Sequence, residues 1–350
     1  MYNDNVIAVL LPLLPNGSSI LKEHCIGVLQ NLAIAENEVN MYQSGVVRAL
    51  LPLLLSSDTM KMKEDIVGVF VNLSVAHSNK INMYRDGIVE VLLAQISSGT
   101  RVYKERVAAT IVNLSGESKN EIPMFKDGIV KHLLDLLDDD YCSSLCRTHI
   151  ASAIGNISIA VENKSPLYRH GVVVRFLRYF HNGSSGYKAK VARVLWSLSF
   201  VTDNQVDMYN DNVVNILLLE FPNSSSIYKE RAAGTLQNLA SAEGNKSLMC
   251  SANSILPTLL PYLLEGSITF KERVAGFVAN LSTSDDNKLK MYNEGENIYR
   301  GELYRTYYFD YTYSLFFYYQ SLFFPTLFFY LFYSFKVINS LCHFIFKYIH

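Results

Sequence analysis

The stretch NKINMYRDGIVEVLLAQISSGTRVYKERVAATIVNLS, residues 79–115, decides the fold because versions of it recur along the chain. Its aromatic position recurs every 40 to 43 residues, at Tyr2, Tyr42, Tyr84, Phe125, Tyr168, Tyr209, Cys250 and Tyr292. The asparagine of its NLS end, the repeat asparagine, recurs at Asn31, Asn72, Asn113, Asn156, Asn238 and Asn280, with Ser197 in one copy. A second, loop asparagine follows at Asn37, Asn79, Asn120, Asn163, Asn204, Asn245 and Asn287. Three registers that advance together identify a sequence repeat of about 41 residues.

Each repeat divides into three predicted helices. Three residues after the aromatic position stands Gly or Asn in all eight copies, at Asn5, Gly45, Gly87, Gly128, Gly171, Asn212, Asn253 and Gly295. These two residue types tolerate positive φ best, so the position predicts a sharp corner that ends a short first helix. The apolar segment that follows, such as 46–54, predicts a buried second helix. Ser, Gly, Asn and Asp after it predict a loop.

The third predicted helix has the clearest periodicity. Its apolar positions lie ten and six residues before the repeat asparagine and one after it, as at Tyr103, Val107 and Leu114. This spacing gives a helix with one buried face. One repeat cannot cover such faces alone, so the repeats must stack on their neighbours. The sequence therefore predicts an all-α solenoid.

The joint spacing of these positions resembles the armadillo repeat over residues 1–292, in seven copies and the start of an eighth. The units lie near 1–40, 41–82, 83–123, 124–166, 167–207, 208–248 and 249–290. The resemblance implies a right-handed superhelix whose third helices line a concave groove, and it implies binding of extended segments of partner proteins. Residues 293–310 are interpreted as a degenerate eighth unit, and residues 311–350 as a hydrophobic aromatic tail.

Charge and motifs exclude several classes of function. The chain of 350 residues has 31 Lys+Arg and 32 Asp+Glu, a net charge of -1, which does not suit a phosphate backbone as partner. Its five cysteines do not form a disulfide framework. No phosphate-binding loop, metalloprotease motif or catalytic grouping stands apart from the repeats. We therefore expect a monomeric, non-enzymatic protein without cofactor or metal that binds other proteins and no nucleic acid.

The repeat asparagines form the first candidate site. On a helical wheel they lie roughly 100° from the centre of the apolar stripe, on a separate face. An amide offers two donors and an acceptor, which suits the backbone of an extended peptide. The alternative, that each amide binds its own neighbouring loop or helix end, stays open. The predicted partner-binding residues of this set are Asn31, Asn72, Asn113, Asn156, Asn238 and Asn280.

Cations form the second candidate site. Seven residues before each repeat asparagine or its substitute stand His24, Asp65, Arg106, His149, Lys190, Arg231 and Arg273. The groove is therefore expected to be basic toward its C-terminal half, where Arg106, Lys190, Arg231 and Arg273 would meet an acidic or phosphorylated segment. The alternative is a solvated face, with glutamates at the preceding position neutralising these cations. Trp196, the only tryptophan, is expected at the groove edge, as a hot spot or packed against the next unit.

Two further patterns can be explained either by a binding site or by packing of the helices. Four residues before the repeat asparagine stand Gly27, Gly68, Gly234 and Gly276, each costing ~1 kcal/mol against Ala inside a helix. They predict close approach of the adjacent helix, or of a ligand. Cys142, Cys146 and His149 have metal-ligand spacing, but Cys146 fills the apolar position of Tyr103, which favours a core residue.

The remaining expectations concern subfamily and location. Nuclear-import adaptors of the armadillo family typically carry Trp four residues before the repeat asparagine, and no unit does, which weakens that interpretation. A cargo adaptor of this type is kept as the alternative function. Residues 311–335 carry no charge and exceed the ~20 residues of a membrane span. A membrane anchor, a packed cap and read-through of non-coding sequence stay open for this tail, and the chain is a candidate fragment of a longer repeat protein. The expected location is cytoplasmic, with nuclear and membrane-tethered alternatives.

Overall fold

The computed structural model describes residues 3–34, 36–57, 59–252, 255–259, 262, 266–288 and 291. The regular structure of these residues is helical throughout, with no strand among them, so the predicted all-α class is confirmed. The described residues fall into two compact units. One comprises those of Met1–Asn245 and Ser254–Phe277, and the other those of Lys246–Asn253 and Val278–His350.

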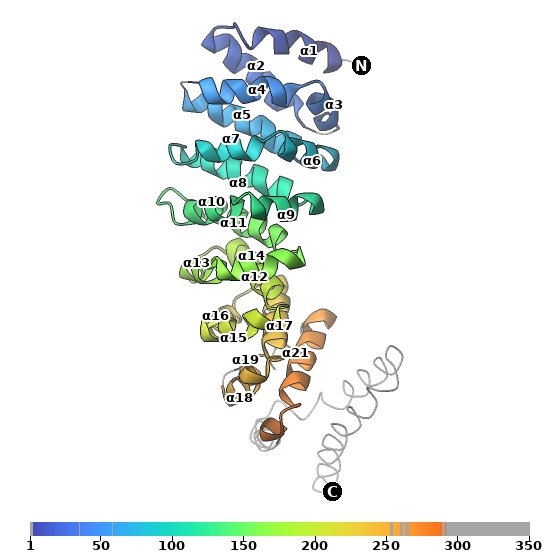
Figure 1. The fold of residues 1–350 in the computed structure, drawn as a ribbon, viewed down its shortest axis with the longest axis vertical. Coiled ribbons are helices and arrows are strands. Elements are labelled where there is room, and N and C mark those ends of the chain that lie inside the picture. Colours follow the sequence, from blue (N-terminus) through green and yellow to red (C-terminus); the bar gives the residue numbers. More distant parts are fainter. Residues whose placement is uncertain are drawn as a thin grey trace. The chain divides into compact units, whose positions relative to one another are not determined.

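The first unit begins with α1 (Asn3–Leu10), the 3-10 helix η1 (Leu11–Leu13) and α2 (Ser19–Leu32). Sets of three helices then follow one another in layers (Figure 1). They are α3 (Glu38–Gln43), α4 (Val46–Ser56) and α5 (Met60–Leu73); α6 (His77–Arg85), α7 (Ile88–Ala94) and α8 (Arg101–Ser115); α9 (Ser118–Lys126), α10 (Ile129–Leu137) and α11 (Ser144–Ile157); α12 (Val161–Arg169), α13 (Val172–Arg178) and α14 (Ser185–Leu198); and α15 (Thr202–Asn210), α16 (Val213–Glu220) and α17 (Ser226–Leu239). The helices α18 (Glu243–Ser251), α19 (Ile255–Leu259) and α21 (Ile268–Leu281) come last.

The corner before each second helix is built as the sequence predicts, with one exception. Positive φ is found at Gly45 (84°), Gly87 (76°), Gly128 (76°), Gly171 (74°) and Asn212 (64°). At Asn5 the prediction was wrong, because α1 runs through this residue without a corner. The remaining two predicted corners, Asn253 and Gly295, lie outside the described residues.

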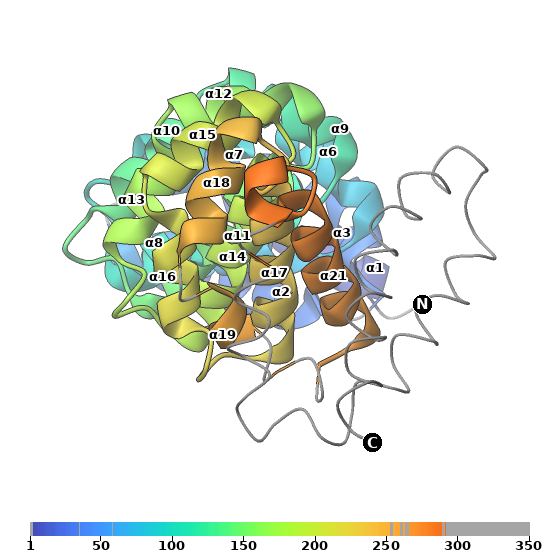
Figure 2. The same ribbon diagram turned by 90° about the horizontal axis from the view of Figure 1, so that it is seen from below.

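The third helices of the first unit pack against one another in succession. Each packs on the next, α2 on α5, α5 on α8, α8 on α11, α11 on α14 and α14 on α17. In the view along the layers (Figure 2), α11, α14 and α17 lie behind one another, with α10, α12 and α13 further out. The buried tyrosines at the start of these helices donate from their hydroxyls to second-helix carbonyls eleven residues earlier. These bonds are 3.2 Å for Tyr103, 3.0 Å for Tyr187 and 2.9 Å for Tyr228.

The loop asparagines explain the second register. In Asn79, Asn120, Asn163 and Asn245, the buried amide nitrogen donates to the carbonyl six residues earlier, at 2.9–3.0 Å. The same nitrogen donates to a first-helix carbonyl of the preceding layer at 2.9–3.1 Å. Each of these asparagines therefore satisfies a carbonyl at the end of a third helix and joins two layers.

The aromatic position also joins layers. The hydroxyl of Tyr42 donates to Asp86 at 2.7 Å, and the equivalent pairs are Tyr84 with Asp127 and Tyr168 with Asp211. Burial, with the Asp86 carboxylate, raises the pKa of Tyr42 to about 12. In the remaining layer both partners change together, and the ring of Phe125 meets the ring of His170 edge-on at 5.3 Å.

The predicted units and the observed layers are offset. The borders at 83, 124, 167 and 208 fall inside α6, α9, α12 and α15, because each first helix begins about six residues earlier. No helix among the described residues is long and apolar enough to cross a membrane. The degenerate unit 293–310 and the tail 311–350, including the candidate span 311–335, lie outside the described residues.

Candidate partner-binding surface

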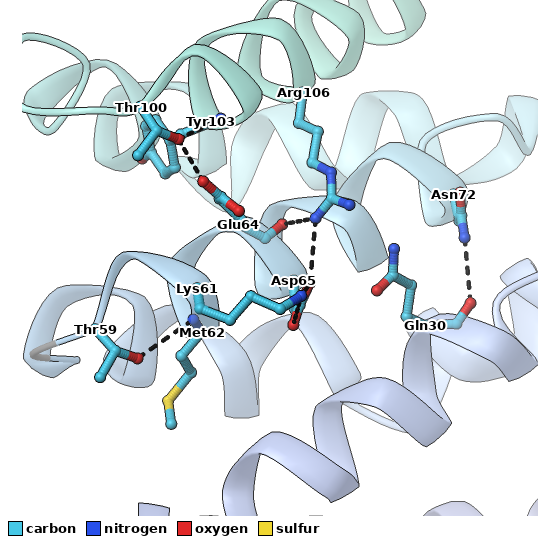
Figure 3. A network of polar contacts seen from close by, with 10 residues as sticks. All are labelled: Gln30, Thr59, Lys61, Met62, Glu64, Asp65, Asn72, Thr100, Tyr103 and Arg106. Carbon is cyan, nitrogen blue, oxygen red and sulfur yellow. Dashed lines mark hydrogen bonds and ion pairs between the residues drawn. The ribbon is translucent and has the colours of Figure 1, made fainter.

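The repeat asparagines use their amide donors inside the protein. Asn72 donates from Nδ2 to the carbonyl of Gln30 in α2 at 3.2 Å, as Figure 3 shows. Asn113, Asn156 and Asn238 likewise donate to a serine hydroxyl at the end of the preceding third helix. The acceptors are Ser74 at 3.0 Å, Ser115 at 3.1 Å and Ser199 at 2.9 Å. The donors of these four amides therefore bind the neighbouring layer, as the alternative interpretation of the sequence holds.

The remaining members of this set differ. Ser197, in place of asparagine, donates its hydroxyl to the carbonyl of Ser158 at 2.7 Å and so keeps the same link between layers. The side chain of Asn31 is exposed and makes no hydrogen bond within the described part of the chain, while Asn280 is half-buried in α21. The Oδ1 atoms of Asn72, Asn113 and Asn238 accept no hydrogen bond from the described residues and remain available as acceptors.

Arg106, on α8, faces a carboxylate within the protein. Its Nη1 donates to the carbonyl of Glu64 and lies 3.4 Å from Oδ1 of Asp65, both on α5 (Figure 3). Asp65 also binds Lys61 at 2.8 Å. The predicted role of Arg106 as a partner-binding cation is therefore weakened, because its charge already faces a carboxylate one layer away.

Arg231 and Lys190 lie in a different electrostatic setting. Arg231, on α17, donates from Nη1 to the carbonyl of Ala189 in α14 at 2.7 Å, the link that Arg106 makes to Glu64. No carboxylate of the described residues lies within ion-pair distance of Arg231 or Lys190. These two predicted cations therefore keep their charge without a direct acidic partner.

Arg193 is a neighbouring cation that the sequence interpretation missed. Its Nη1 donates to Oδ1 of Asn156 at 2.9 Å. Burial, then Arg193 and Arg231, lower the pKa of Lys190. Burial and Arg193 likewise lower the pKa of Arg231, against the opposing charge of Glu230. Arg193 could have been found from sequence, since it is the only charged residue four positions before the repeat asparagine or its substitute.

Trp196 packs against a predicted cation of another layer. The guanidinium carbon of Arg273 lies 4.2 Å from the centre of the indole ring. The two side chains cross α17 at Gly234, where an added Cβ would come within 2.5 Å of Arg273 Nη1 and 2.8 Å of Trp196 Nε1. Trp196 Nε1 and Arg273 Nε are buried without a hydrogen-bond partner among the described residues. Trp196 therefore packs against its neighbours and contributes a ring face to the cation.

The other glycines that stand four residues before the repeat asparagine differ in what lies beside them. A Cβ at Gly68 would meet Gln30 Nε2 at 2.5 Å, and one at Gly276 would meet Gln237 Nε2 at 2.1 Å. Side chains of the adjacent helix therefore occupy the space at Gly68, Gly234 and Gly276, while nothing lies within 4 Å of a Cβ at Gly27. Cys146 is fully buried in the core position that Tyr103 fills elsewhere.

A second ring and a further cation extend this contact. Phe200, in the loop after α14, lies 5.4 Å from Trp196 between ring centres, and Lys164 Nζ of α12 lies 4.9 Å from the Phe200 ring centre. Each residue of this region contributes a cation or an aromatic ring. None of these cations has a carboxylate within ion-pair distance among the described residues. We call them the basic aromatic surface: Lys164, Lys190, Arg193, Trp196, Phe200, Arg231 and Arg273.

Comparison with known proteins bears on the fold alone. No protein-family model matches the chain, and no curated protein is similar to it in sequence. It is similar to a crystal structure described as an engineered protein, with a TM-score of 0.72 and 19% identity over 79% of this chain and 68% of that one. A second engineered protein matches with a TM-score of 0.61 and 19% identity over 68% of this chain and 97% of that one. Likeness at this identity indicates a similar helical fold and nothing about function.

Proposed function

We propose that the chain is a non-enzymatic interaction scaffold, an armadillo-type solenoid that binds extended acidic segments of partner proteins on the basic aromatic surface. Support for the architecture comes from the 41-residue register, the recurring three-helix layers and the third helices that pack each on the next. Such an array presents side chains of successive third helices along one line, which suits an extended chain.

The observation that carries the proposal is the grouping of Lys190, Arg193 and Arg231 with no carboxylate within ion-pair distance among the described residues. Burial disfavours the charged forms, and the neighbouring cations add to this for Lys190 and Arg231, while Glu121 opposes it for Arg193 and Glu230 opposes it for Arg231. A carboxylate placed among them would favour the charged forms and would gain charge-assisted hydrogen bonds. The free surface therefore has unfavourable electrostatics that an acidic ligand relieves.

The contrast with Arg106 supports the choice of region. Arg106 occupies the same position in its helix and makes the same bond to a backbone carbonyl, but Asp65 lies beside it. An acidic ligand at Arg106 would also approach Asp65 and be repelled. Binding is therefore expected over α14, α17 and α21 rather than over α5 and α8.

A repeat asparagine whose amide oxygen accepts no hydrogen bond adds a second contact. The Oδ1 atom of Asn238 accepts no hydrogen bond within the described part of the chain, and Asn238 lies on α17 beside this surface. A free amide oxygen can accept from a backbone N–H of an extended peptide. In this proposal the cations provide affinity for acidic side chains, and the amide oxygen holds the peptide backbone.

Peptide binding by the full chain tests the proposal. Fluorescence anisotropy would compare dye-labelled peptides of one length that are rich in Glu, Gln or Lys, at low and moderate salt. The expected result is salt-sensitive binding of the Glu peptide alone, lost in the Arg231→Glu and Arg273→Glu variants. Arg106→Gln is the matched control and should bind nearly as the unaltered chain does. Equal binding of all three peptides, or no loss on charge reversal, would refute the proposal.

A further inference from the structure

We propose that the partner segment carries an aromatic residue between acidic residues, and that this ring sits on Phe200 and Trp196 while the acidic residues meet Lys164 and Arg273. This inference rests on the proposed function and specifies its ligand. Its basis is the order of side chains across the basic aromatic surface, in which two rings lie between two cations.

The contacts form one continuous line. Lys164 Nζ lies 4.9 Å from the Phe200 ring centre, the Phe200 and Trp196 ring centres are 5.4 Å apart, and the Arg273 guanidinium carbon lies 4.2 Å from the Trp196 ring centre. The four residues come from α12, the loop after α14, α14 and α21. The arrangement therefore joins the layer of α12–α14 to α21 and is not a property of one helix.

Neither terminal cation has a carboxylate within ion-pair distance among the described residues. Burial lowers the pKa of Lys164, and no nearby acidic group opposes it. Burial also lowers the pKa of Arg273, with only partial opposition from Glu230 and Glu272. In the free protein both cations rest on ring faces. The partial negative charge of a ring face attracts a cation more weakly than the full charge of a carboxylate does.

One member of the ring pair, Phe200, is exposed where a partner could cover it, while Trp196 is half-buried. Phe200 is 53% exposed, and the same position holds an exposed aliphatic residue in three other copies, Ile34, Val75 and Ile159, and Gly116, Ser241 or Thr283 in the rest. Phe200 is the only aromatic residue of this set, and Trp196 lies beside it on the preceding turn. An aromatic preference is therefore expected at this layer alone.

Electrostatics fixes the order of residues in the ligand. The negative face of an aromatic ring repels a carboxylate but accepts the positive edge of another ring. Acidic side chains are therefore excluded from the Phe200–Trp196 pair and directed to Lys164 and Arg273 on either side. The ligand that fits this line has an acidic residue, an aromatic residue and a second acidic residue along an extended backbone.

The test uses the full chain and three synthetic peptides of equal length. One places Phe between Glu residues, the second replaces that Phe with Ala, and the third keeps Phe but replaces Glu with Lys. Binding is followed by the emission of Trp196, the only tryptophan, because none of the peptides contains one. We expect the Glu–Phe peptide to bind about tenfold more tightly than the Glu–Ala peptide, as the loss of an aromatic contact and its buried area implies.

Variants distinguish the inference from the proposal beneath it. Phe200→Ser should remove the tenfold preference, whereas Ile159→Ser, at the equivalent and equally exposed position, should leave it unchanged. Equal affinity for the two Glu peptides, with the Lys peptide not bound, would overturn the inference and leave the proposed function standing. Failure of both Glu peptides to bind would overturn the proposed function itself.

Discussion

The substitution Gly234→Ala tests how Trp196 and Arg273 meet across α17. An added Cβ would lie 2.5 Å from Arg273 Nη1 and 2.9 Å from Trp196 Cδ1, closer than atoms in contact allow. Both side chains must shift, and the contact between guanidinium and indole opens. The control is Gly27→Ala, at the equivalent position of α2, where a Cβ would meet nothing within 4 Å.

The two substitutions share one energy term and differ in another. Ala in place of Gly stabilises a helix interior by ~1 kcal/mol, so Gly27→Ala should raise the free energy of unfolding by about that amount. Gly234→Ala gains the same term but loses a cation–π contact worth ~0.5–2 kcal/mol. Its net effect should lie between ~0.5 kcal/mol stabilising and ~1 kcal/mol destabilising, which is ~0.5–2 kcal/mol below the control.

Two measurements read this difference. Urea titrations followed by circular dichroism compare the free energies of unfolding of both variants with the unaltered chain. Trp196 emission reports the contact directly, and it should shift in Gly234→Ala and stay unchanged in Gly27→Ala. Stabilisation of Gly234→Ala by as much as Gly27→Ala, with unchanged emission, would refute the packing described here.

Three further predictions concern the layers. Asn113→Ala should cost about 1–2 kcal/mol in urea unfolding, because it removes the bonds to Val71 and Ser74, whereas Asn31→Ala should be nearly neutral; equal effects would contradict the link between layers. Burial lowers the pKa of His149 below 6.5, Lys190 lowers it further, and Glu105 opposes the shift. The unfolded chain therefore binds more protons than the folded one, and the free energy of unfolding should fall as pH drops from about 7 to 5. His149→Gln should flatten that decline, and an unchanged slope would exclude His149 as its source. Tyr42→Phe should lower the free energy of unfolding by about 1 kcal/mol at neutral pH, since the bond to Asp86 is lost, and a thermal melt without change would contradict this.

The sequence predicted features that depend on local chemistry. A Gly or Asn three residues after the aromatic position predicted positive φ at Gly45 and Asn212, and the structure has positive φ at both residues. The apolar periodicity likewise predicted the buried positions of the third helices, such as Val107 and Leu114. These features follow from a residue and its own helix, so one repeat contains the information.

The site was harder to predict because its chemistry lies between layers. Arg106 and Arg231 occupy equivalent positions, and the residue at the same position one layer earlier, Asp65 or Lys190, decides which of them faces a carboxylate. Lys164 and Phe200 meet through spatial contact between the first helix of a layer and the loop after its third helix, which no spacing in the repeat indicates. At Asn5 the local pattern predicted a corner that the structure does not have, because α1 continues through this residue.

The measurement that most directly tests the central claim is the site of attachment of an acidic ligand. A Glu-rich peptide with a photoreactive group at its centre would be irradiated with the full chain, and mass spectrometry would locate the cross-linked residues. The account predicts attachment within α14, α17 and α21, competed by unlabelled Glu peptide and weakened by salt. Attachment over α5 and α8, beside Asp65, or attachment unaffected by the competitor, would contradict it.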